Sequence, residues 1–199
     1  MPYEYEIFIS YRRSSTAGRW VQNHLLPRLS DRINEISPQE VRISCDTKLD
    51  SGVLWPEELK RRLRMSGLLL CVWTADYFRS PWCMAEWMSF KAREALLGMF
   101  TPANPQGLVY PIRYADGKFF HPDAKNTQCR LDFSALSYPD EVFRLSKKYI
   151  VFDDLVTEMA NDLVNRLVTL PAWQDNFPIA EPHPMPEVKL ARPILVDTV

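Results

Sequence analysis

The sequence predicts an α/β fold in which helices flank a doubly wound parallel sheet. Two observations predict it. Short apolar runs alternate with segments whose apolar residues recur at helical spacing, as strands and helices do when they alternate along a chain. The run at residues 67–73 (GLLLCVW) is also apolar on both faces, as expected for a central strand covered by helices on each side.

Five segments are candidate strands. Residues 5–11 (YEIFISY) are rich in aromatic and β-branched side chains, and residues 41–45 (VRISC) form a second short run. The central run at residues 67–73 is the third, and residues 107–112 (GLVYPI) are the fourth, with a proline near its end. A short fifth strand is expected at residues 130–133 (RLDF).

Helices are expected between these strands. The segment from Pro81 to Leu97 has a strong start signal, because Ser80 can cap a helix and a proline is tolerated at the first helical position. The other helices are read from apolar residues on one stripe: Val21, Leu25, Leu29 and Ile33; Trp55, Leu59 and Leu63; and Leu155, Met159, Leu163 and Leu167.

One domain, residues 1–170, accounts for this pattern. From Leu170 onward the periodicity stops and prolines become frequent, so residues 171–199 are expected to form an extended C-terminal tail. Two interpretations remain open for the tail: a segment that packs on the domain or connects it to a partner, and a disordered end.

The composition excludes several classes of protein. The chain has 199 residues, and its 24 basic and 25 acidic residues give a net charge of -1, so no basic surface for nucleic acid or anionic lipid is expected. No signal peptide and no apolar run long enough for a membrane span is evident, and we expect a cytoplasmic protein. No metal site is expected, because the cysteines stand singly and far apart: Cys45, Cys71, Cys83 and Cys129.

The loops after the first and third strands carry the polar and aromatic residues. With five strands in the flavodoxin-like order 2-1-3-4-5, the winding reverses between strands one and three, which is where ligands bind in open α/β sheets. The first loop begins with Arg12 and Arg13, and the other reads TADYFRSPWCMAEW. The motifs GxGxxG, GxxxxGK[ST] and GxSxG are absent, which disfavours dinucleotide-binding dehydrogenases, P-loop nucleotidases and serine hydrolases.

Three blocks together resemble the Toll/interleukin-1 receptor (TIR) domain family. YEIFISYRRS at residues 5–14 is similar to the family's first strand and its polar exit. CDTKLDSGVLWPEELKRRL at residues 45–63 is similar to its loop after the second strand and the following helix. YFRSPWCMAEW at residues 77–87 looks like its S-x-W-C-x-x-E element. The resemblance spans residues 3–170 and implies a TIR-type fold.

Some members of this family are adaptors, and others cleave NAD⁺ at the bond between nicotinamide and ribose. The resemblance implies that Glu86 is the catalytic glutamate of such an enzyme. Nicotinamide leaves NAD⁺ as a neutral molecule, so no general acid is needed, and one fixed carboxylate can stabilise the developing oxocarbenium ion. Trp82 and Cys83 lie one helical turn before Glu86. The alternative for Glu86 is a solvated glutamate near a helix N-terminus.

The same resemblance implies a substrate-binding set around Glu86. Arg12 and Arg13 are candidates for the pyrophosphate, or they are a surface pair. Trp82 either stacks on a ring or packs in the core, and Cys83 is expected to pack because no nearby histidine would activate it. The full set of candidate substrate-binding residues is Ser10, Tyr11, Arg12, Arg13, Asp46, Lys48, Trp82 and Cys83.

Two main functions follow from the resemblance, and a third is a toxin-like enzyme that simply depletes NAD⁺. The first is an NAD⁺ nucleosidase or cyclase that releases nicotinamide and ADP-ribose or a cyclic ADP-ribose signal, similar to bacterial anti-phage immune proteins, with NAD⁺ as substrate and no cofactor. The second is a non-enzymatic adaptor that binds other TIR domains through residues 46–52. Self-association and an effector partner are expected, and nucleic acid and membranes are not.

Overall fold

A computed structural model describes residues 3–45, 55–125 and 127–183. Within these residues, five parallel strands form one sheet in the order β2-β1-β3-β4-β5. This confirms the predicted fold class and strand order. The strands are β1 (Tyr5–Ser10), β2 (Ile43–Cys45), β3 (Ser66–Trp73), β4 (Val109–Arg113) and β5 (Leu131–Asp132).

The central strand β3 is buried along its whole length. It pairs with β1 on one side and β4 on the other. Pro111 lies inside β4, opposite Cys71, although the sequence led us to expect that it would weaken the end of this strand. The fifth strand is two residues long, which leaves much of the outer edge of β4 without a neighbouring strand among the described residues.

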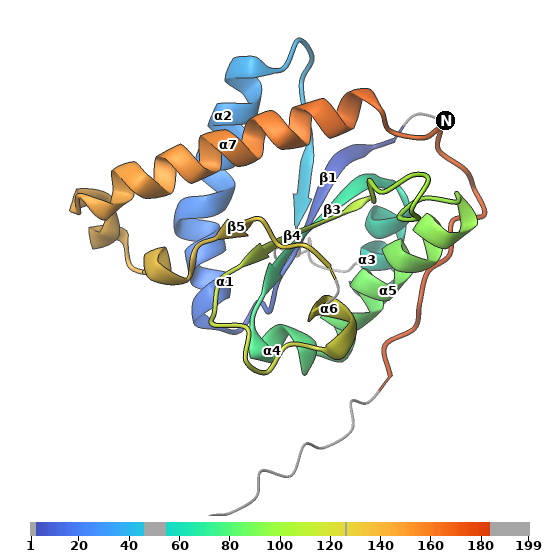
Figure 1. The fold of residues 1–199 in the computed structure, drawn as a ribbon, viewed down its shortest axis with the longest axis horizontal. Coiled ribbons are helices and arrows are strands. Elements are labelled where there is room, and N and C mark those ends of the chain that lie inside the picture. Colours follow the sequence, from blue (N-terminus) through green and yellow to red (C-terminus); the bar gives the residue numbers. More distant parts are fainter. Residues whose placement is uncertain (1–2, 46–54, 126, 184–199) are drawn as a thin grey trace, which may run out of the picture.

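Helices cover both faces of the sheet (Figure 1). One face carries α1 (Thr16–Trp20), the π-helical turn η1 (Val21–Leu25), α2 (Leu26–Ile36) and the long α7 (Lys148–Val168). The other carries α3 (Trp55–Arg64) and α5 (Pro81–Leu96). The predicted helices are therefore present. Asp153 of α7 is bound by Arg28 and Arg32 of α2, which ties the two longest helices of the first face together.

The periodicity did not predict four short elements: α4 (Ala75–Phe78), α6 (Pro122–Lys125), and the 3₁₀ turns η2 (Ser134–Leu136) and η3 (Glu141–Leu145). None is long enough to show a helical repeat. The loop between β4 and β5 contacts the end of β3 and the short helix α4. Its Phe120 packs against Trp73 and Phe78, with ring centroids 6.0 and 5.1 Å apart.

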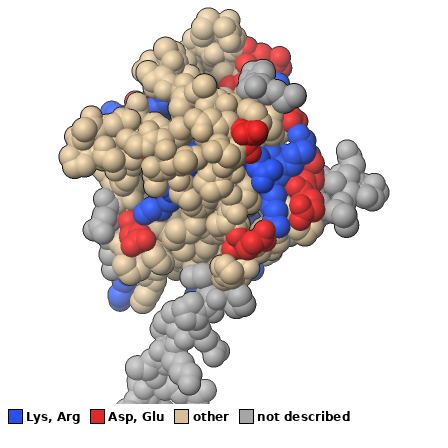
Figure 2. All heavy atoms as spheres, turned by 90° about the vertical axis from the view of Figure 1, so that its right-hand side faces the viewer, with Lys and Arg blue, Asp and Glu red and all other residues tan. Residues whose placement is uncertain are grey.

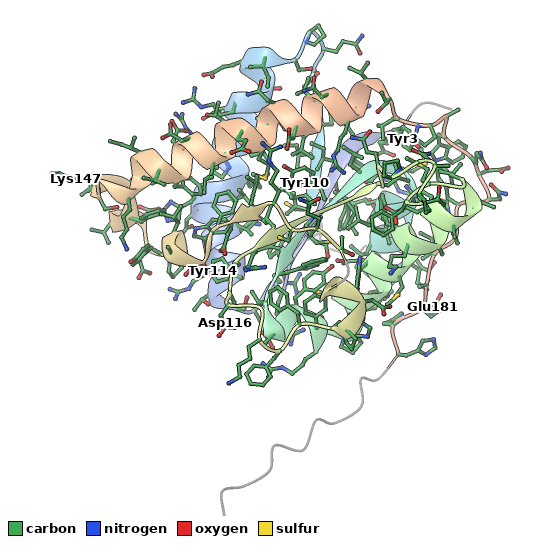
Figure 3. All side chains as sticks on the ribbon, in the orientation of Figure 1. Tyr3, Tyr110, Tyr114, Asp116, Lys147 and Glu181 are labelled. Atoms are coloured by element: carbon green, nitrogen blue, oxygen red, sulfur yellow. The ribbon has the colours of Figure 1, made fainter. Side chains whose placement is uncertain are left out.

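Residues 171–183 pack along the domain, and we call this segment the strap. Its Phe177 is 2% exposed, and the ring lies 4.2 Å from the guanidinium of Arg93, a buried residue of α5. At one end Tyr3 donates to the carbonyl of Pro171, and at the other Glu181 pairs with Lys60 of α3 at 2.8 Å (Figure 3). Within its described part, the tail is thus a packed segment. Residues 184–199 lie outside the described residues.

Charges of both signs lie close together on the face that carries α3 (Figure 2). The basic run at residues 60–64 is ion-paired: Arg61 and Arg62 bind Glu58, and Arg61 also binds Glu4. Lys60, Arg61 and Arg62 are thus each paired with an acidic side chain. No helix in the described part of the chain is both long enough and apolar enough to cross a membrane.

Candidate active site

The candidate site lies at the carboxyl edge of the sheet, where β1 and β3 end side by side. Ser10 is the last residue of β1 and pairs in register with Cys71 of β3. Residues at one register position of neighbouring parallel strands point to the same face of the sheet. The helix α5 covers this face, and it begins as predicted: the side chain of Ser80 accepts from the backbone N–H of Cys83, and Pro81 occupies the first turn.

Glu86, on the second turn of α5, is directed at this strand end. Its side chain is buried, with the residue 4% exposed, and the Ser10 hydroxyl donates to its Oε2 at 2.5 Å. The oxygen of Ser10 also lies 2.8 Å from the hydroxyl of Tyr77. Glu86 is therefore a buried carboxylate held by a side-chain hydroxyl beneath the ends of β1 and β3. The solvated-glutamate alternative does not describe it.

Among the described residues, several neutral polar groups lie near the carboxylate. Burial raises the pKa of the Cys83 thiol well above its ordinary value, and the nearby negative charge of Glu86 adds to this effect. Burial raises the pKa of Tyr77 and of Cys71 in the same way. These groups hold their protons at neutral pH. Cys83 is thus a poor nucleophile, because the thiolate is the reactive form.

Arg12 lies at the rim of the site, at the N-terminus of α5. Its guanidinium donates to the hydroxyl of Ser80 at 3.3 Å and lies 3.7 Å from a carboxylate oxygen of Asp76. The loop that carries Arg12 folds tightly onto α1. A Cβ atom at Gly18 would lie 2.2 Å from the carbonyl oxygen of Arg13, so only glycine permits this approach.

The structure gathers part of the predicted substrate-binding set and leaves the rest apart or undescribed. Ser10 contacts Glu86, Cys83 lies one turn away on the same helix, and Trp82 is half-buried against the core. Tyr11 is buried, and its hydroxyl accepts from Gln22 of η1, on the opposite face of the sheet. Arg13 is exposed, and Asp46 and Lys48 lie outside the described residues.

Sequence reasoning missed Tyr77 and Cys71. Tyr77 belongs to the single-turn helix α4, where Thr74 caps the backbone N–H of Tyr77 at 2.9 Å and so fixes its position. Cys71 was read only as part of an apolar strand. The sequence does contain one signal for the position of Tyr77. Thr74 lies three residues before it, which is the spacing between an N-cap residue and the backbone N–H that it binds.

Among the described residues, the donor set around Glu86 does not suit a metal ion. The groups nearest to it are a hydroxyl, a phenol and protonated thiols. Throughout the described residues, no three His, Cys, Asp or Glu side chains stand close enough together to bind a metal.

Fold and site together define a doubly wound α/β protein with a buried carboxylate at the carboxyl edge of its sheet. The model of the TIR domain family matches residues 7–144, and the chain belongs to this family. The resemblance seen in the three sequence blocks is thereby confirmed.

The TIR domains in the structure of the activated Roq1 resistosome, which directly recognises the pathogen effector XopQ, are similar over 83% of this chain and 98% of their own, with 16% identity and a TM-score of 0.39. A search of curated proteins finds no match.

Proposed function

We propose that this TIR domain cleaves NAD⁺ at the nicotinamide–ribose bond and that Glu86 is its catalytic carboxylate. One observation carries the proposal: Glu86 is 4% exposed and accepts a hydrogen bond from Ser10 at the strand edge where ligands of doubly wound sheets bind. Burial of a carboxylate is costly, and a glutamate retained at such a site is a candidate for function.

The chemistry requires little beyond a fixed negative charge. The C–N bond between nicotinamide and ribose breaks, its electron pair goes to the pyridine nitrogen, and nicotinamide leaves without a proton. The ribose becomes an oxocarbenium ion, which a carboxylate stabilises most strongly where water is excluded. Attack by water, with loss of its proton, gives ADP-ribose. Attack by a nitrogen of the adenine gives a cyclic product.

Arg12 is the best placed candidate for the pyrophosphate. It lies beside the N-terminus of α5, where the helix dipole also favours an anion. Its side chain is 40% exposed and so is accessible to a ligand from the rim. For Arg13, Trp82, Asp46 and Lys48, a part in substrate binding stays a prediction.

The proposed setting is a cytoplasmic immune response in which the nucleotide product is a signal, as the family resemblance implies. Members of the family that cleave NAD⁺ often do so as assemblies, so self-association belongs to the proposal. An effector protein would then bind the product. The chemical identity of that product distinguishes a signal from simple depletion of NAD⁺.

Nicotinamide release tests the proposal. The full chain is incubated with NAD⁺ over a series of protein concentrations, so that an assembly can form, and the products are separated by liquid chromatography and identified by mass spectrometry. We expect release from the wild type and a loss of about 100-fold or more in Glu86→Gln, the effect of removing one electrostatic group from a catalytic site. Glu141→Gln, which changes an exposed glutamate of η3, is the matched control.

An adaptor is the second candidate, and one observation favours it. Five large apolar side chains are exposed within 14 residues, and two of them, Tyr138 and Val142, line a groove of about 460 Å³. Exposed apolar patches mark protein contacts. The five side chains are Tyr138, Val142, Leu145, Ile150 and Val151. Wild-type protein that self-associates but releases no nicotinamide at any concentration would establish the adaptor and refute the enzyme.

A further inference from the structure

A cavity of about 540 Å³ opens beside the outer edge of β4, on the far side of that strand from β3. Its walls come from β4, from α7 and from the connections on either side of β4. The Glu86 site lies elsewhere, beneath the ends of β1 and β3. Pockets of about 300–1,000 Å³ hold small molecules, so this second cavity is large enough for a ligand of its own.

The cavity exists because β4 has little strand beside it. β5 pairs only with the last two residues of β4. Before them, Pro111 has no N–H to offer a further strand. The N–H of Val109 donates to Glu94 at 3.0 Å, and the carbonyl of Gly107 accepts from Arg166 at 3.2 Å. An added peptide strand would find these groups absent or occupied, so we expect a small molecule here.

Arg166 is a fixed positive charge in the wall of this cavity. It is half-buried, and its guanidinium lies 4.8 Å from the centroid of the Tyr110 ring. Among the described residues no carboxylate lies within ion-pair distance of Arg166, whereas Arg130, the other arginine of the wall, binds two acidic side chains of α7. One of its five N–H groups binds the carbonyl of Gly107. Arg166 is therefore held in place with donors left for an anion.

Phe100 supplies an aromatic surface to the same cavity. Its φ is +55°, in the left-handed region that side chains other than glycine rarely adopt, and the residue is 46% exposed. The ring lies 3.3 Å from the position that a Cβ atom at Gly107 would take. Because the carbonyl of Gly107 binds Arg166, the ring and the guanidinium both contact this one glycine. A strained backbone that presents an exposed ring to a cavity is a feature of ligand sites.

Asp162 adds a hydrogen-bond acceptor one helical turn before Arg166 on α7. The hydroxyl of Tyr110 (Figure 3) and the guanidinium of Arg130 both donate to its Oδ2, at 3.1 and 3.3 Å. Within the described part of the chain, its Oδ1 has no hydrogen-bond partner, and the side chain is 32% exposed. An acidic side chain of this kind binds the ribose hydroxyls in dinucleotide sites.

We infer that this cavity binds a nucleotide, with the phosphate on Arg166, the ribose hydroxyls on Asp162 and the base on Phe100. A nucleotide carries an anion, adjacent hydroxyls and a flat ring in one small molecule. Every base can stack on an aromatic side chain, and arginine binds phosphate oxygens through parallel N–H donors. The cavity is separate from the site at Glu86, so the inference does not depend on the proposed function.

The test is a titration of the full chain, labelled with ¹⁵N, with AMP, followed by the backbone amide resonances in NMR spectra. AMP has no nicotinamide, so the proposed reaction does not consume it. We expect saturable shifts at the amides of Gly107, Val109 and Thr127, which border the cavity. The amides of Ser10 and Glu86 report separately on the other site. Inorganic phosphate alone and adenosine alone should each bind more weakly than AMP, because each makes only part of the contacts.

Two variants separate the charge from the ring. Arg166→Gln should raise the Kd for AMP at the cavity about 10-fold or more, as expected for the loss of a charged hydrogen bond. Its matched control is Arg144→Gln, because exposed Arg144 also donates to a backbone carbonyl. Phe100→Leu keeps an apolar side chain at an exposed position, so it should fold, and the loss of stacking should raise the Kd about 5-fold or more. Phe119→Leu, at another exposed aromatic residue, should bind like the wild type.

The outcomes for the nucleotide site and for the enzyme are distinguishable. AMP shifts at the cavity that weaken in Arg166→Gln and in Phe100→Leu, but not in their controls, support the inference. Shifts confined to the amides of Ser10 and Glu86 refute it, and so does inorganic phosphate that binds as tightly as AMP. If AMP binds at the cavity but the wild type releases no nicotinamide, the nucleotide site stands and the proposed function fails.

Discussion

Two buried glutamates on the same helix, Glu86 and Glu94, have different partners. Both are nearly inaccessible, at 4% and 5% exposed. Glu86 lies near the start of α5 and accepts from a side-chain hydroxyl at the carboxyl edge of the sheet. Glu94 lies two turns further on, where one of its oxygens accepts from the backbone N–H groups of Leu108 and Val109 at 2.6 and 3.0 Å.

Burial alone therefore does not distinguish these two carboxylates. Glu94 satisfies two backbone donors at the entry to β4, which is a structural task, since buried N–H groups without partners are costly. Glu86 binds a hydroxyl that is itself part of a side-chain network, at the edge where a ligand is expected. The two glutamates therefore differ in the kind of partner and in the part of the sheet that they face. Glu86 binds a side chain at the carboxyl edge, and Glu94 binds backbone N–H groups at the start of β4.

The largest expected effect is a separation of stability from activity. Glu94→Ala should lower the free energy of unfolding by about 2–4 kcal/mol, because it leaves two buried donors unpaired and opens a cavity. Nicotinamide release per folded molecule should be unchanged.

Glu86→Gln should abolish release without lowering stability, because it removes a buried charge. Urea unfolding of both variants, with Glu94→Gln as the isosteric control, measures the first quantity. Equal losses of stability in Glu86→Gln and Glu94→Ala would contradict the claim that only Glu94 has a structural task.

A smaller loss of stability is expected from a change at Ser89, which lies between the two glutamates on α5 and contacts the strap. The hydroxyl of Ser89 accepts from the backbone N–H of Ala180 at 2.8 Å. Ser89→Ala removes this acceptor and should cost about 1 kcal/mol, with faster hydrogen exchange at Ala180. Exposed Ser146 provides the control as Ser146→Ala. Unchanged exchange at Ala180 would mean that other contacts hold this part of the strap.

The smallest expected effect is on the dependence of stability on pH. Burial raises the pKa of Glu94 in the folded protein, and its two backbone donors offset this only in part. A carboxyl with a raised folded pKa favours the fold at low pH, and this contribution is lost as pH rises through the folded value. Relative to Glu94→Gln, the wild type should therefore lose stability as the pH rises above the ordinary carboxyl range.

Melting temperatures of the wild type and Glu94→Gln, measured at a series of pH values, give this difference directly. A difference in melting temperature that stays constant with pH would show that the two backbone donors fully compensate the burial of the Glu94 charge. If the wild type instead gains stability relative to Glu94→Gln as the pH rises, the two backbone N–H donors lower the pKa of Glu94 by more than burial raises it.

The strand order and the place of Glu86 were predicted from a flavodoxin-like winding and from the family resemblance. The sequence by itself determined the fold class, the main helices and the start of α5. These follow from local patterns: the alternation of apolar runs and helical stripes, and the Ser80-Pro81 start that sets where α5 begins. Only the tertiary structure decided the partners of the buried polar groups. Ser10 and Glu86 are 76 residues apart, and Ser10 and Tyr77 are 67 apart.

The packing of the strap on Arg93 was likewise decided by tertiary contacts. The physical reason is that periodicity records which face of an element avoids water. The neighbour that a buried hydroxyl, carboxylate or guanidinium meets depends on strand register and helix placement, and no local pattern carries that information.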